Sequence, residues 1–160
     1  ELVANIDVAP TLLDVAGITV DGMDGGSFLP LVRGEKPEGW RDALLYEYFW
    51  ERNYPQTPTQ HALRDDRYKY IRYHGIWDVD ELYDLEADPE ERRNLIFDPD
   101  QADRVQAMNE RLFDLLHGSG GDSLRLLEDR GTKFYHRRDV GSRGAAFPPD
   151  FYRPAGTSGK

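Results

Sequence analysis

Residues 61–73, with the sequence HALRDDRYKYIRY, carry the side chains of this protein that are best suited to binding chemistry. Four basic and two acidic side chains give the stretch a charge of +2, whereas the 160-residue chain has a net charge of −10. Three tyrosines are interleaved with these charges. Arginine and lysine pair with anionic groups through charge-assisted hydrogen bonds. The stretch therefore fits either one edge of a binding site for an anionic ligand or a plain amphipathic β-hairpin.

His61 and Arg64 are the two residues of this stretch that we predict to bind substrate. They follow a proline-containing loop, and the junction of a loop with a strand can present polar groups to a ligand. Successive side chains of a strand point to opposite faces. His61 and Leu63 are therefore expected on one face of the strand, and Ala62 and Arg64 on the other.

The rest of the sequence offers little for catalysis. It contains no cysteine, which excludes disulfides, thiolate metal sites and cysteine nucleophiles. No serine lies in a G-x-S-x-G motif, and the four histidines lack a ligand spacing such as H-x-x-x-H. The acidic stretch DVDELYDLEADPEE lacks the alternating ligands and central glycine of an EF-hand loop. We predict no catalytic residue and no metal ligand within this sequence.

Composition limits the partners of the protein. An aromatic content of 12% is too high for a disordered chain. The negative net charge argues against nucleic acid, because binding to phosphates requires a basic surface. No apolar run approaches the roughly 20 residues that cross a membrane. The opening ELVANIDVAP resembles the middle of a domain, so we expect a fragment of a longer protein.

Helix signals appear at the beginning and in the second half of the chain. The stretch 7–17 predicts a short helix that Asp7 caps and Gly17 ends. Its expected buried face consists of Leu12, Leu13 and Ala16. Asp-Pro pairs at Asp88 and Asp98 each predict a helix start. The second pair should open a long helix that ends near 117.

The middle of the chain has the pattern of strands. Residues 43–50 are rich in aromatic side chains and precede a loop with proline and glutamine, and the short polar Asp65-Asp66-Arg67 between two further runs indicates a hairpin. A long helix lying across one face of such a sheet predicts an α+β fold in two layers. The expected antiparallel strands are 43–50, 61–64, 68–73 and 81–85.

Three longer motifs occur in a fixed order between residues 1 and 117: D-x-A-P-T-L-L-D-x-A-G, R-x-x-x-Y-K-Y-I and E-L-Y-D-L-x-x-D-P-x-E-x-x-N-L. In this order they resemble the C-terminal region of the type I, formylglycine-dependent sulfatases. The nearest resemblance is to bacterial glycan sulfatases similar to N-acetylglucosamine-6-sulfatases. The resemblance implies the small C-terminal subdomain of an alkaline-phosphatase-like α/β sulfatase.

The resemblance also implies what the complete enzyme contains. It would hydrolyse sulfate esters of a carbohydrate, such as a glycosaminoglycan sugar, and would be periplasmic or secreted. Its calcium ion and its formylglycine would belong to a larger N-terminal domain on which this chain packs. This chain would form one wall of the substrate cleft, with His61 and Arg64 as contacts to the sugar. Because the nucleophile and the metal ligands are missing, the chain alone is predicted to be inactive.

We accordingly expect three parts in the chain. Residues 1–40 would be the last helix and crossover of the N-terminal sulfatase domain, residues 41–117 the C-terminal subdomain, and residues 118–160 an irregular tail. Two other interpretations remain open at this point. The chain could be a stand-alone, non-catalytic module that binds carbohydrate or anions. It could also be a fragment of a related phosphoesterase of the alkaline phosphatase superfamily.

Overall fold

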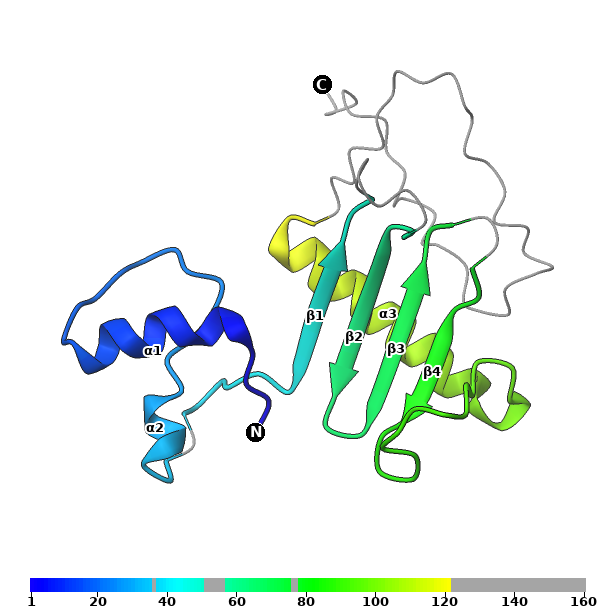
Figure 1. The fold of residues 1–160 in the computed structure, drawn as a ribbon, viewed down its shortest axis with the longest axis horizontal. Coiled ribbons are helices and arrows are strands. Elements are labelled where there is room, and N and C mark those ends of the chain that lie inside the picture. The colour runs from blue at the N-terminus through cyan, green and yellow to red at the C-terminus, as the bar shows by residue number, and fades with distance from the viewer. Residues whose placement is uncertain (36, 51–56, 76–77, 122–160) are drawn as a thin grey trace, which may run out of the picture. The chain divides into compact units, whose positions relative to one another are not determined.

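The computed structural model describes residues 1–35, 37–50, 57–75 and 78–121 (Figure 1). Contacts divide the chain into two compact units, the first of which is Glu1–Leu44, while the second begins at Leu45. The predicted tail 118–160 lies outside the described residues from position 122 onward. The domain boundaries expected from the sequence stay predictions.

The first unit is built from short helices. A 3-10 turn, Asn5–Asp7, leads directly into α1, Val8–Val15, and α2 follows at Leu29–Val32. This confirms the predicted helix near residues 7–17. Gly17 has a φ of 72°, the left-handed conformation that glycine adopts without steric cost, and α1 ends just before it.

Asp7 does not cap α1, contrary to the prediction, because its side chain makes no cap hydrogen bond to that helix. The side chain is fully buried and accepts hydrogen bonds from the backbone N–H of Ala4 at 2.7 Å and of Gly26 at 3.0 Å. The guanidinium of Arg41 binds both carboxylate oxygens. Asp7 therefore joins the start of the helix to two distant segments of this unit.

The glycine pair in the DGG sequence allows this close approach. A Cβ atom at Gly25 would lie 2.1 Å from the carbonyl oxygen of Ile6, which no side chain can tolerate. A Cβ atom at Gly26 would lie 3.3 Å from the indole of Trp40. That indole donates a hydrogen bond to the carbonyl of Leu2 at 3.0 Å. The loop, the helix start and Trp40 therefore pack as one cluster.

The expected buried face of α1 is largely exposed in this unit. Leu12 is 65% exposed and Ala16 is exposed, whereas Leu13 is half-buried. Thr11 is the buried residue of the helix, and its hydroxyl donates to the carbonyl of Asp7 at 2.7 Å. The apolar side chains of α1 therefore lack a covering layer within the described residues of this unit.

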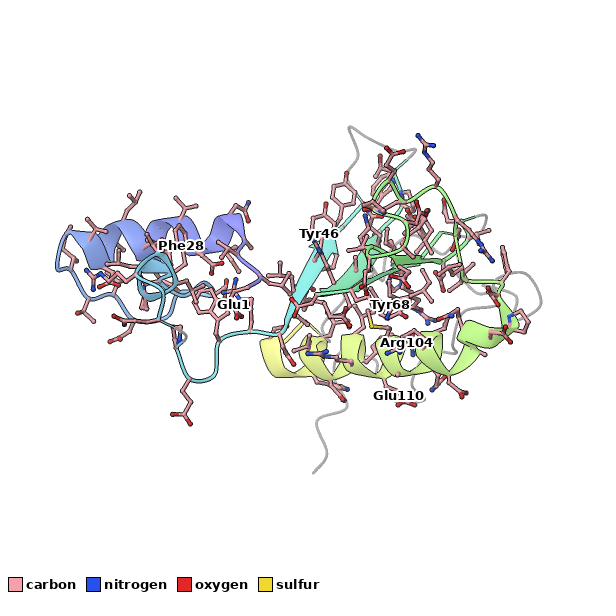
Figure 2. All side chains as sticks on the ribbon, turned by 90° about the horizontal axis from the view of Figure 1, so that it is seen from below. Glu1, Phe28, Tyr46, Tyr68, Arg104 and Glu110 are labelled. Atoms are coloured by element: carbon pink, nitrogen blue, oxygen red, sulfur yellow. The ribbon has the colours of Figure 1, made fainter. Side chains whose placement is uncertain are left out.

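The second unit is a four-stranded sheet with one long helix, as predicted. Its strands are hydrogen-bonded in the order β1-β2-β3-β4, and Figure 1 shows them alternating in direction. Figure 2 shows the helix α3 running along one face of the sheet. The elements are β1 (Ala43–Tyr48), β2 (Gln60–Asp65), β3 (Tyr68–Tyr73), β4 (Glu81–Asp84) and α3 (Ala102–Ser119).

The core of this unit lies between α3 and the sheet. Along β3, buried and half-buried residues alternate strictly, as expected for a strand covered on one face. Each fully buried apolar side chain stabilises the fold by about 1.5–3 kcal/mol. The buried apolar side chains are Leu63, Tyr68, Tyr70, Leu82, Ile96, Val105, Met108, Leu112, Phe113 and Leu116.

Only the second of the two predicted Asp-Pro helix starts is correct. Asp98 caps a 3-10 turn, Pro99–Gln101, by accepting from the N–H of Asp100 at 3.0 Å, and α3 follows. The helix ends at Ser119 before Gly120, whose φ is 75°. It is therefore two residues longer than the sequence suggested.

The segment after Asp88 forms a turn instead of the predicted helix. Glu91 has a φ of 54°, which interrupts any helix there. The carboxylate of Asp88 accepts from the N–H of Arg93 at 2.8 Å. The side-chain oxygen of Asn94 then accepts from the N–H of Leu82 at 3.0 Å. The turn therefore brings Asn94 back to the edge of β4, whereas a continuous helix after Asp88 would move this segment away from the sheet.

Replacing Asp7 by Asn tests how strongly this residue holds the first unit together. The substitution keeps the shape but leaves Arg41 without its carboxylate, so we expect a loss of about 2–4 kcal/mol in the free energy of unfolding. Urea denaturation followed by circular dichroism measures it. Asp14→Asn is the matched control, because the Asp14 carboxylate accepts from the Ser27 hydroxyl in an exposed position. Equal losses in the two variants would contradict the assigned role.

Candidate functional site

His61 lies near the start of β2, on the face that α3 covers, and is fully buried. Its Nδ1 atom is 2.7 Å from Nε2 of His74, the residue that follows β3. The two rings are perpendicular, with centroids 4.8 Å apart. The ring of Phe49 approaches His61 edge-on at 5.9 Å. On the other side of His61, its Nε2 is 3.6 Å from Oε1 of Glu47 on β1.

The surroundings of His61 keep its imidazole neutral. Burial, followed by the positive charge of Arg72, lowers the pKa of His61 to about 4. Burial also raises the pKa of Glu47 above its ordinary value. A neutral imidazole has one N–H donor and one acceptor nitrogen. The neutral ring can therefore donate one hydrogen bond and accept one, and its Nδ1 lies within hydrogen-bond distance of His74.

A second polar cluster ties α3 to the sheet next to His61. Arg72 is 1% exposed, and its Nη1 donates to Oδ1 of Asn109 on α3 at 2.6 Å. The hydroxyl of Tyr70 donates to the same oxygen at 3.3 Å. The guanidinium of Arg72 also lies over the ring of Phe113, 5.5 Å from its centroid. The signal in the sequence is the polar residue Asn109 at a buried position of the helix.

Arg64 lies elsewhere on the unit. It is exposed and pairs with Lys69 across the hairpin, near the end of β2, on the face opposite His61. The structure confirms the predicted assignment of His61 and Arg64 to opposite faces and does not bring the two side chains together. Neither placement tests a contact with substrate, so both contacts stay predictions.

The other cations of the hairpin are paired within the protein. Nη2 of Arg67 donates to Oδ2 of Asp84 at 2.7 Å, and hydrogen bonds from Arg67 hold the pKa of Asp84 at about 2. Lys69 pairs with Glu91. Arg104 of α3 lies 4.4 Å from the ring centroid of Tyr68 (Figure 2). These contacts favour the hairpin interpretation of the stretch over a continuous anion-binding strip.

The face of the sheet opposite α3 carries a carboxylate between two tyrosines. The hydroxyl of Tyr73 donates to Oε1 of Glu81 at 3.2 Å, and that of Tyr83 donates to Oε2 at 3.0 Å. Burial and the contact with Glu81 raise the pKa of Tyr83 to about 12. The cluster was not expected from the sequence, because it depends on the pairing of β3 with β4.

Within the described part of the chain, no group of three or more His, Cys, Asp or Glu residues is placed to hold a metal ion. The helices of that same part include none that is both long and apolar enough to cross a membrane.

The sheet and its helix have the architecture of the C-terminal subdomain of alkaline-phosphatase-like sulfatases. A structure solved with its substrate D-glucosamine-2-N,6-O-disulfate has a TM-score of 0.67 and 26% identity, covering 76% of this chain and 25% of that chain. A phosphonate monoester hydrolase of Agrobacterium radiobacter has a TM-score of 0.58 and 33% identity, covering 70% and 24%.

Residues 1–117 match the family described as "N-sulphoglucosamine sulphohydrolase, C-terminal", and the chain belongs to this family. A Δ4,5-hexuronate-2-O-sulfatase of Bacteroides thetaiotaomicron is 39% identical over 125 residues, which are 77% of this chain and 25% of the relative. An N-acetylglucosamine-6-O-sulfatase of the same organism is 35% identical over 97 residues, 57% of this chain and 17% of the relative. The predicted family resemblance is confirmed. The chain spans a quarter or less of these relatives.

The buried His61 should give the second unit a specific pH dependence. Between pH 6.5 and about 4 the unfolded chain protonates His61 whereas the folded chain does not. Folding stability should therefore fall as the pH falls through this window, by on the order of 2 kcal/mol. His61→Phe should remove this contribution, which urea denaturation at several pH values measures. A stability difference between variant and wild type that stays constant from pH 7.5 to 4.5 would contradict it.

Proposed function

We propose that this chain is the C-terminal part of a sulfatase that hydrolyses sulfate esters of a carbohydrate, and that it forms one wall of the substrate cleft. The observation that carries the proposal is the family match over residues 1–117. Relatives named as sulfatases of hexuronate and of N-acetylglucosamine support a sulfated sugar as the substrate. Because the chain spans at most a quarter of these two relatives, the reaction would depend mainly on the rest of the enzyme.

The chemical step would use groups that this chain does not supply. In the complete enzyme, a formylglycine would supply the nucleophile and a calcium ion the positive charge that stabilises the reacting sulfate. The described residues offer no cluster suited to a metal ion, and the sequence has no cysteine to convert. No step of the reaction is therefore assigned to the residues of this chain. Their role would be to bind and orient the sugar.

The first unit would dock on the larger domain of the complete enzyme. Its helix α1 exposes apolar side chains that a self-sufficient unit would cover, among them Leu12 at 65% and Val15 at 64%. Ile6, just before the helix, is 46% exposed. The surface that these three side chains form is apolar, so its partner would be an apolar layer of the same enzyme.

A related phosphoesterase is the second candidate, favoured by the match to a phosphonate monoester hydrolase at 33% identity. Sulfate and phosphonate esters are both tetrahedral anions, and the described residues contain nothing that distinguishes them. The nucleophile of the complete enzyme would distinguish the two candidates. A formylglycine motif of the type C-x-P-x-R favours the sulfatase, and a Thr or Ser nucleophile without it favours the phosphoesterase.

The proposed activity is tested with the complete enzyme and with this chain alone. We expect the complete enzyme to release inorganic sulfate from a 6-O-sulfated glucosamine or a 2-O-sulfated hexuronate, detected by ion chromatography. The chain alone should release none, because it lacks the nucleophile. A complete enzyme that cleaves phosphonate or phosphate monoesters and no sulfated sugar would overturn the sulfatase assignment.

The proposed docking of the first unit predicts a difference in exposed apolar surface. The isolated chain should bind a hydrophobic dye such as ANS, and Leu12→Gln with Val15→Gln should lower that binding. In the complete enzyme the same pair of substitutions should destabilise the fold by about 2–4 kcal/mol, because the side chains are then buried. An unchanged melting temperature of the complete enzyme would contradict the docking. Val32→Gln, at another exposed apolar position of this unit, is the control.

A further inference from the structure

We draw no further inference here: the strongest candidate, the outer edge of β1 at one side of the sheet, carries none because nothing among the described residues shows what covers it.

Discussion

The hydrogen bond from Arg72 to Asn109 is the contact on which the arrangement of the second unit depends. It joins the middle of α3 to β3, and both partners are almost completely buried. A buried guanidinium is costly unless its donors are satisfied, so the helix has to lie where Asn109 can accept. Once α3 is held in this position, the alternation of the strands decides which residues are enclosed. His61, which pairs with Arg72 across the hairpin, is enclosed with it.

Charge pairing within the chain explains why a basic hairpin exists in an acidic protein. The cations of the hairpin pair with carboxylates of β4 and of the segment that follows it, as the pairs Arg67–Asp84 and Lys69–Glu91 show. The turn after Asp88 brings Glu91 back to β3 in a left-handed backbone conformation. The hairpin and the acidic segment therefore stabilise each other. A local count of charges along the sequence could not reveal this, because the partners are 17 and 22 residues apart.

The sequence predicted the elements whose signal is local and missed the contacts that are made at a distance. Short aromatic-rich runs bounded by turn residues identified the strands of the sheet, and the second Asp-Pro pair identified the start of α3. Asp7 and Asp88 both have the residue type of a helix cap. The carboxylate of Asp7 instead pairs with Arg41 and accepts a hydrogen bond from the N–H of Gly26. The carboxylate of Asp88 accepts from the N–H of Arg93, in the turn that leads to Asn94. The predicted cap is absent at Asp7 because of tertiary contacts and at Asp88 because of a local turn, and residue type alone encodes neither. For the candidate site, sequence reasoning singled out His61 but did not predict its burial or its contact with His74.

The distribution of satisfied and unsatisfied polar groups limits where the second unit can bind a ligand. Because α3 occupies one face of the sheet, a ligand that contacts the strands would have to approach the other face of the sheet or the ends of the strands. On the other face, Glu81 already accepts from two tyrosines and Lys69 is paired. At the end of β3, by contrast, the imidazole pair includes a buried nitrogen without a hydrogen-bond partner among the described residues. Buried polar atoms of this kind are rare in folded proteins and call for an explanation. The carboxylate of Glu47 lies 3.6 Å from this nitrogen of His61, too far for a hydrogen bond.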